Sequence, residues 1–482
     1  MTFRKIPVNV PFWSNVEDES KVNVADQRND VIKDLAGTTI RRPGLAIFGD
    51  ELSQSVDGWF YWEHTDLVYI VSGTNLYSLT QNGTVTLISS GVFTAGKNVT
   101  FAESGDFSLI TAGATRKIFI TNGGRVVVYN GAATSTLNGA NDPVQSSHVV
   151  MFDTYLLSNE LSNTQYDESV LRSKVADPIT FEGAFFSAES HPDKLTALHT
   201  EWDELALFGQ RSIENFYNDK TTPLTAIPGA TIADGTRSPW TIKLIDNAYL
   251  FMNKARRLIR IDGRQPIVVS QPIDNILNDE PDYENAEGEK ITLKGKTLYL
   301  LTINDRTLVY DYSINEWVGE WTFWNKTRAK YQAFKARNFI NIEPWNMTLC
   351  TDKGNGKLYK LDFETYQDYG NEIRSSVITG NIDHGTSREK RSNELKIKLK
   401  RGKKVKTLDA DVEPKMLLRW KDNGSGVWSN YRDIPLGFQG DNIFYYSLFM
   451  LGTYRSRQYE FVCTDNVPFS IVEVNEDVEL LR

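Results

Sequence analysis

Cysteine is scarce in this chain of 482 residues, which contains only Cys350 and Cys463. Two cysteines exclude a disulfide framework and a four-cysteine zinc site, and leave a single bridge as an open alternative. Histidine is also rare. The five histidines form no i, i+4 pair, and His191 and His199 lie in a stretch that we expect to be a loop. We therefore expect no metal site and no cofactor.

Long hydrophobic runs are absent too. The longest run, Ile443–Leu451, is interrupted by Ser447 and is too short to span a bilayer. No apolar segment of signal-peptide length follows Met1. Because 40% of the residues are hydrophobic and 24% are charged, the composition is that of a soluble globular protein. We expect no membrane insertion and synthesis in a reducing compartment.

An excess of basic charge is also lacking. Lysine and arginine number 53 against 62 acidic residues, which gives a formal net charge of −9. A dedicated binder of duplex DNA holds the phosphates with a broad basic face, so this balance argues against that class of protein.

Aromatic residues and short β-rich runs are plentiful. Leu67–Gly73, Asn75–Leu79 and Thr84–Ile88 predict three successive strands, the last two joined by an Asn82-Gly83 hairpin turn. Similar groups start near residues 67, 107, 154, 204, 247, 296 and 347, so they repeat every 40 to 51 residues. This period is typical of β-propeller blades.

The repeat predicts an all-β protein with a β-propeller of six or seven blades. A pair of meandering β-sandwiches has the same strand and turn composition and is the alternative. An earlier strand within residues 46–62 is available to close the ring. We expect an N-terminal arm over residues 1–45, the propeller over 46–385 and a C-terminal antiparallel β-sandwich over 386–482.

Two charged stretches interrupt this pattern. Residues 274–289 hold seven acidic side chains with Pro281 and Gly288, and we expect an exposed loop there. Near residue 386 the composition becomes basic, and Leu395–Lys400 alternates aliphatic and lysine residues. In a strand this alternation puts the lysines on one face and the aliphatic side chains inward.

The lysine strand is the candidate binding feature of the sequence, with Lys396, Lys398, Lys400 and Arg401 as its residues. If these cations lined a passage, they would contact nucleic acid backbone without reading its sequence. The same residues are compatible with a contact to a partner protein. The plainer alternative is a solvated edge strand that its lysines protect from aggregation.

No pattern of catalytic residues stands out. Gly91–Lys97 resembles a phosphate-binding loop, but the Ser or Thr that binds magnesium is missing and a strand-like segment follows. No Gly-x-Ser-x-Gly motif occurs, and neither cysteine has the surroundings of a nucleophile. We expect that the protein is not an enzyme.

Several motifs together resemble one family. The most specific block runs from Ser187 to Leu195, continues at Trp202–Leu205 and ends with Leu207–Tyr217. Three further motifs agree with the same family in order and position. These are Arg41–Gly44, Leu308–Asp311 before Glu316-Trp317, and Tyr454–Arg457. Over roughly residues 38–475 the chain resembles the packaged-DNA stabilisation proteins of short-tailed bacteriophages, which are also called tail accessory or tail nozzle proteins.

The resemblance implies a structural role in the phage tail, after assembly in the host cytoplasm. Such proteins form a six-fold ring below the portal and adaptor, so a homohexamer is implied. The ring continues the DNA channel, helps to retain the packaged genome and gives tail fibres, a spike or a needle a base to dock on. Genomic DNA would pass through without sequence specificity.

A carbohydrate-binding or polysaccharide-degrading propeller is the alternative function. Aromatic residues such as Trp317, Trp321 and Trp324 are candidate platforms for sugar rings, although tryptophans of this kind more often belong to a core or a subunit contact.

Overall fold

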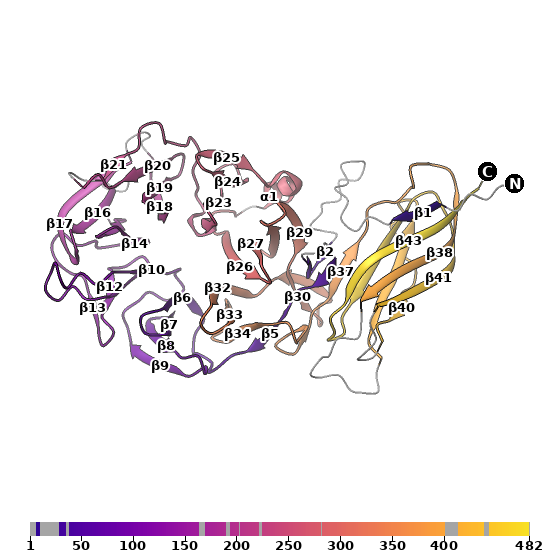
Figure 1. The fold of residues 1–482 in the computed structure, drawn as a ribbon, viewed down its shortest axis with the longest axis horizontal. Helices are drawn as coiled ribbons and strands as arrows, with labels where there is room; N and C mark the ends of the chain where they lie inside the picture. Colours follow the sequence, from indigo (N-terminus) through magenta and orange to yellow (C-terminus); the bar gives the residue numbers. More distant parts are fainter. Residues whose placement is uncertain are drawn as a thin grey trace. The chain divides into compact units, whose positions relative to one another are not determined.

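The computed structural model describes residues 6–9, 28–34, 38–162, 169–188, 193–201, 203–220, 224–280, 282–400, 413–437 and 443–481 (Figure 1). The regular secondary structure of these residues is almost entirely strand. Their helices are α1 (Asp274–Asp279) and the short 3-10 turns η2 (Pro239–Thr241) and η3 (Gln271–Ile273). The all-β prediction is confirmed.

The chain divides into two compact units by its contacts. Unit 1 comprises Met1–Ala46, Thr292–Phe334 and Lys360–Arg482, and unit 2 comprises Ile47–Ile291 and Lys335–Tyr359. This grouping differs from the predicted bounds of 1–45, 46–385 and 386–482, because strands that are distant in the sequence pair with one another.

Unit 2 contains five four-stranded antiparallel sheets, each a simple meander. Their strands are β6 (Val56–Trp62), β7 (Leu67–Ser72), β8 (Asn75–Leu79) and β9 (Val85–Ser89); β10 (Thr100–Glu103), β11 (Ile118–Thr121), β12 (Val127–Tyr129) and β13 (Thr134–Thr136); β14 (Val149–Phe152), β15 (Tyr155–Asn159), β16 (Ser169–Lys174) and β17 (Asp177–Ser187); β18 (Leu195–Glu201), β19 (Glu204–Gly209), β20 (Ile213–Tyr217) and β21 (Thr225–Ala226); and β22 (Lys243–Ile245), β23 (Ala248–Met252), β24 (Leu258–Asp262) and β25 (Gln265–Val268).

The sheets of unit 2 surround a common centre as propeller blades. In Figure 1 the first strands β6, β10 and β14 lie toward the centre, and β9, β13 and β17 lie outside. Hydrophobic clusters fill the space between successive sheets: one joins side chains of β7 and β8 to β11 and β12, and another joins β15 to β18 and β19. Because both faces of each blade are apolar, each blade depends on its neighbours for burial.

The same pattern continues in two further strand groups. These are β26 (Glu287–Leu293), β27 (Lys296–Ile303), β28 (Arg306–Asp311) and β29 (Glu316–Glu320), and then β32 (Ala336–Ile342), β33 (Met347–Asp352) and β34 (Leu358–Asp362). The described residues therefore contain seven groups of this repeat. In the sheet order, β5 (Gly44–Ile47) follows β34, and the Phe48 amide donates to the Leu358 carbonyl at 2.8 Å. An early strand thus completes the last group. It ends at Ile47, at the start of the stretch 46–62 where the sequence predicted a closing strand, and most of that stretch forms β6 of the first sheet instead.

Six of the seven predicted repeat starts fall at the second strand of a group, and the one near residue 107 is wrong. Phe107–Ile110 forms a turn, in which the Thr111 amide donates to the Phe107 carbonyl at 2.8 Å. The Asp106 carboxylate accepts from the Ser108 amide at 3.0 Å and stabilises this turn. The second strand of the group is β11 instead.

Unit 1 is built around a β-sandwich. One sheet has the order β3-β4-β43-β38-β41, with β1 also on β43; the other has the order β26-β27-β28-β29-β2-β37-β42-β39-β40. The strands not yet given are β1 (Ile6–Asn9), β2 (Arg28–Asn29), β3 (Val31–Lys33), β4 (Thr39–Arg41), β37 (Ser375–Ile378), β38 (Lys390–Lys400), β39 (Lys415–Asp422), β40 (Arg432–Pro435), β41 (Ile443–Tyr454), β42 (Arg457–Cys463) and β43 (Ser470–Leu480).

A single apolar core lies between these two sheets. It combines Leu395, Ile397 and Leu399 of β38 with Leu418 of β39 and Phe461 of β42, all buried. Two short pairs complete the element set: β30 (Thr322–Asn325) with β31 (Lys330–Ala333), and β35 (Gln367–Asp368) with β36 (Asn371–Glu372). The C-terminal sandwich is thus present, and N-terminal strands belong to its sheets.

The acidic stretch 274–289 is more ordered than the sequence predicted. Helix α1 covers its start, with Ile276 and Leu277 buried, and its end belongs to β26, where Glu289 is buried. Among the described residues between them, Asp282, Glu284 and Asn285 are exposed, as expected of a loop, whereas Ala286 is buried. Cys350 and Cys463 are both buried and free, so the single disulfide left open by the sequence is not formed.

Candidate interaction sites

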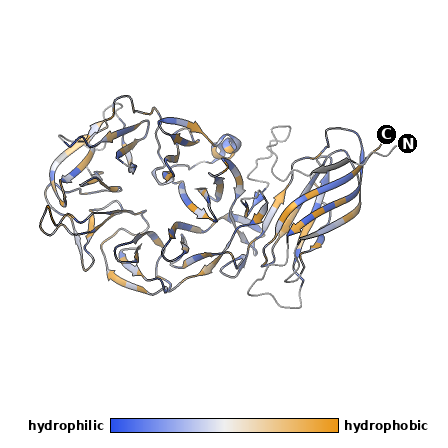
Figure 2. Ribbon diagram, in the orientation of Figure 1, coloured by the Kyte–Doolittle hydropathy of each residue, from blue (hydrophilic) through white to orange (hydrophobic). Residues whose placement is uncertain are grey.

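The lysine strand corresponds to β38, and its predicted alternation is confirmed. Leu395, Ile397 and Leu399 are buried in the sandwich core, while Lys396 and Lys400 are exposed and Lys398 is half-buried. Figure 2 shows the resulting alternation of hydrophilic and hydrophobic residues along β38 and its neighbours. Arg401 lies outside the described residues.

The interpretation of this segment as an edge strand is wrong, because β38 pairs with β41 on one side and β43 on the other. Lys396 and Lys398 both lie close to Tyr445 of β41, with their Nζ atoms 5.1 and 5.6 Å from its ring centroid. On the other side Lys398 faces Glu473 of β43. The lysines therefore form a row in the middle of an open sheet face, beside an aromatic and an acidic side chain.

Arg42 of the Arg41–Gly44 motif forms a buried charge network within unit 1. Its guanidinium donates to Asp30 at 2.5 Å and, with two nitrogens, to Asp368 at 2.9 and 2.6 Å. Burial raises the pKa of Asp30 against the effect of Arg42. Burial alone would lower the pKa of Arg42, but the charges and hydrogen bonds of Asp368 and Asp30 raise it above its ordinary value. Arg42 thus ties the N-terminal strands to the later chain.

Arg41 binds neutral groups instead. It donates to the Ile373 carbonyl at 2.7 Å, to the Val467 carbonyl at 2.9 Å and to the Ser375 hydroxyl at 3.0 Å. Gly44 completes the motif, because a Cβ atom there would lie 2.4 Å from the Gln367 carbonyl oxygen. Three of the four positions of the motif, Arg41, Arg42 and Gly44, therefore have a structural explanation.

The Tyr454–Arg457 motif forms a second buried network in unit 1. Arg457 donates to both carboxylate oxygens of Asp422, at 2.6 and 3.0 Å, and its ring neighbour Tyr454 donates to Glu476 at 2.9 Å. Burial would raise the pKa of Glu476, but hydrogen bonds from His384 and from other buried side chains lower it. The sequence did not reveal Asp422 and Glu476 as its partners, since both are distant along the chain.

The most specific motif block also has a structural role. Asp193 accepts hydrogen bonds from the amides of Arg211 and Ser212, at 2.5 and 3.1 Å, and so fixes the turn between β19 and β20. A Cβ atom on Gly209 would lie 2.5 Å from the Asp193 carboxylate. Residues 189–192 and Trp202 of this block lie outside the described residues.

A polar cavity of about 300 Å³ lies within unit 2. Its lining includes Glu287, which pairs with Arg337 at 3.1 Å and Lys353 at 2.7 Å. His148 also lines it and stacks on Trp240 at 5.0 Å, and burial lowers the pKa of His148 to about 4. Its charged groups are thus largely matched, and no group of three or more potential metal ligands occurs among the described side chains.

The three candidate sugar platforms belong to the packing of unit 1. Trp317 and Trp321 are buried, and Trp317 packs against Tyr310. Trp324 is half-buried, with Tyr331 at 4.9 Å and the Arg374 guanidinium 5.0 Å from its ring centroid. Trp317 and Trp321 therefore present no open face of the kind that stacks on a sugar, and the Arg374 guanidinium lies over the ring of Trp324.

Residues 18–366 match the family model Phage_stabilise, described as "Bacteriophage P22 Gp10, beta-propeller". The chain belongs to this family. The match to the Gp10 beta-propeller family confirms the resemblance to packaged-DNA stabilisation proteins, and it agrees with the blades of unit 2. The protein is therefore a bacteriophage structural protein and a component of the virion.

Among solved structures, the extracellular domain of a hybrid two component system from B. thetaiotaomicron is similar with a TM-score of 0.41 and 9% identity, covering 88% of this chain and 59% of that chain. The Cps50 (Swd1) beta-propeller domain from Myceliophteria thermophila has a TM-score of 0.40 and 9% identity, covering 66% of this chain and 98% of that chain. The chain spans about three fifths of the length of the first. The search of curated proteins found no match.

The described helices of this family member include none that is long and apolar enough to cross a membrane.

Proposed function

We propose that the protein forms the nozzle of a short phage tail. In this proposal six copies make a ring that extends the DNA channel of the portal and adaptor, helps to retain the packaged genome and docks tail fibres, a spike or a needle. The observation that carries the proposal is the family match over residues 18–366. We expect no catalytic activity from a protein with this role.

The packing of each unit supports a mechanical role. Apolar clusters join successive blades of unit 2, and in unit 1 two buried arginine networks fix segments from both ends of the chain. Breaking a buried ion pair costs several kcal/mol of free energy, so both networks stabilise unit 1 against local opening. Such a body suits a ring that bears the pressure of packaged DNA.

The net charge of −9 supports passage of DNA without a tight hold on its phosphates. A passage lined by acids would repel the phosphates, and the DNA would slide without a sequence-specific hold. Reversing acidic residues that face the channel should therefore slow ejection. An ejection rate that is unaffected by every such reversal would remove this part of the proposal.

Antibody labelling of intact particles, viewed by electron microscopy, tests the assignment. We expect label at the tail, below the capsid vertex that holds the portal. An antibody against the major capsid protein is the control, since it should label the whole shell. Particles without label, with the protein free in the lysate, would contradict the proposal. Binding or turnover on a glycan panel would then identify a carbohydrate-directed propeller.

A further inference from the structure

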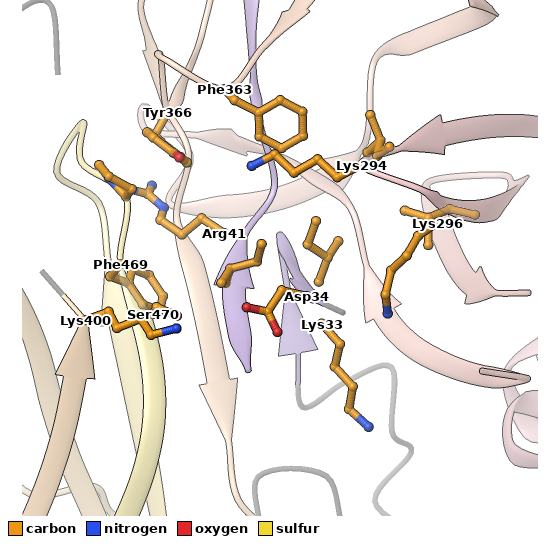
Figure 3. Close-up of a pocket in the computed structure, with 15 residues that line it drawn as sticks. Lys33, Asp34, Arg41, Lys294, Lys296, Phe363, Tyr366, Lys400, Phe469 and Ser470 are labelled. Carbon is orange, nitrogen blue, oxygen red and sulfur yellow. The ribbon is translucent and has the colours of Figure 1, made fainter. Parts of the chain in front are cut away.

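A cavity of about 370 Å³ lies within unit 1 and is separate from the networks described above (Figure 3). It is bounded by β3 and β4, by residues around β27, and by the start of β43. Five cationic side chains line it, and they are Lys33, Arg41, Lys294, Lys296 and Lys400. Among the described residues, Asp34 is the only acidic residue of the lining.

The cavity has an excess of positive charge even after its ion pairs are counted. Lys33 pairs with Glu316 at 2.8 Å, and Lys296 pairs with Asp311 at 2.9 Å. Arg41 is buried and binds carbonyl and hydroxyl oxygens, and no carboxylate of the described residues lies within ion-pair distance of it. A buried cation without a counter-charge creates a strong field for anions nearby.

Apart from Ser470, the remaining walls are mainly apolar. They are formed by Ile32, Ile40, Leu293, Leu298 and Pro468, together with three aromatic side chains. A mostly apolar cavity of this size with a few charged groups is the usual form of a site for a small ligand or for one or two side chains.

Cationic side chains already lie over the aromatic rings that line the cavity. The Lys294 Nζ atom lies 3.8 Å from the centroid of Phe363, and the Arg41 guanidinium lies 5.4 Å from Tyr366 and 5.9 Å from Phe469. Figure 3 shows the Lys294 side chain next to the ring of Phe363. Rings used in this way do not offer a free face to a nucleobase, which argues against a nucleotide as the ligand. The apolar walls instead suit an aliphatic side chain.

We propose that this cavity binds an acidic peptide segment of a partner protein, in which an aliphatic side chain lies next to a carboxylate. The aliphatic group contacts the wall that includes Ile32 and Leu298, and the carboxylate lies in the field of Arg41 and within reach of Lys400 at the rim. Charge complementarity and the apolar wall favour this ligand, whether or not the protein is a tail nozzle.

Fluorescence anisotropy with the full-length protein tests this proposal. The probe is a fluorescein-labelled octapeptide of alternating leucine and glutamate. A serine–glutamate octapeptide tests the apolar contact, and a leucine–lysine octapeptide tests the charge. We expect saturable binding of the first peptide only, with weaker binding at higher salt.

Two variants of β38 form a matched pair, in which Lys396→Glu is the control for Lys400→Glu. Lys400→Glu should weaken binding about tenfold, because it replaces a charge-assisted contact with repulsion. Lys396→Glu makes the same change on β38 but does not line the cavity, so binding should stay within about twofold of the wild type. Both lysines are exposed, and unchanged thermal unfolding of the variants would show that the fold is intact.

Three results would overturn the proposal. Equal losses in the two variants would indicate a diffuse electrostatic effect, and equal binding of the serine–glutamate peptide would remove the apolar contact. Absence of saturable binding of the leucine–glutamate peptide would also overturn it. Saturable binding of labelled AMP in the same assay would then identify a nucleotide site.

Discussion

At the scale of residues, Arg42 has the largest predicted effect on stability. Arg42→Ala leaves Asp30 and Asp368 buried without a counter-charge, so the free energy of unfolding of unit 1 should fall by about 3–5 kcal/mol. Urea unfolding followed by tryptophan fluorescence would measure it. Lys326→Ala removes an exposed ion pair with Glu372 and should cost less than about 1 kcal/mol. Similar losses in both variants would contradict the assignment.

Because His148 is buried, we expect the stability of the propeller blades to depend on pH. Its pKa is about 4 in the folded protein against an ordinary value of 6.5, because it is buried. Below pH 6.5 the unfolded chain binds a proton that the folded chain does not, so the free energy of unfolding should decrease as the pH falls from 6.5 to about 4. The loss from this residue is at most about 3 kcal/mol.

Histidine proton signals in NMR spectra would test this prediction, since the chain has only five histidines. One signal, absent from His148→Gln, should titrate with a midpoint near 4. The variant should also show a flatter dependence of unfolding on pH than the wild type. A midpoint near 6.5 for the His148 signal would show that the ring is accessible to water and would refute the prediction.

At the scale of elements, β5 depends on the absence of a side chain at Gly44. A Cβ atom there would approach the carbonyl oxygens of Gln367 and Thr365 to 2.4 and 2.7 Å, and both are backbone atoms that cannot turn aside. Gly44→Ala should therefore destabilise the protein by about 1–3 kcal/mol. Gly426→Ala is the control, because no atom lies within 4 Å of a Cβ there. Thermal unfolding of both variants would show the difference, and equal melting temperatures would count against this close approach.

The positions of strands were predictable from the sequence where a local pattern of apolar residues and turns marks them. The pairing between strands that are distant in the sequence was not predictable. The repeat starts at 67, 154, 204, 247, 296 and 347 were found because each begins a buried second strand with a turn after it. Phe107–Ile110 has the same apolar composition but forms a turn, since composition does not report hydrogen bonding. The pairing of β4 with β43 has no local signature, so the sequence did not show that these two strands lie in one sheet.

The candidate site was predictable only in part, for the same reason. Alternation along β38 gave the outward direction of Lys396 and Lys400 correctly. It could not show that Lys400 shares a cavity with Lys33 and Lys294, because three distant segments meet there. The sequence also could not show that β38 is paired on both sides.

At the scale of the whole molecule, charge predicts weak binding to DNA. With a net charge of −9, the protein should bind duplex DNA no more tightly than about 10⁻⁴ M at physiological salt. Electrophoretic mobility shift would measure this, with a basic DNA-binding protein as the positive control. If β38 does contact DNA, Lys396→Glu combined with Lys398→Glu should weaken the residual binding further. Tight binding that survives this double variant would place the contact elsewhere.

The pairing of early strands with late ones also determines when unit 1 can fold. Thr39 of β4 pairs with Ile471 of β43, and β1 pairs with the same strand. At about 5–20 residues per second, the ribosome delivers β43 about 20 to 90 seconds after β4. Until then the nascent N-terminal strands have no partner, whereas each four-stranded meander of unit 2 is complete as soon as it is synthesised. A prematurely terminated chain would therefore expose an unfinished sandwich core, and only full-length chains would be competent to assemble.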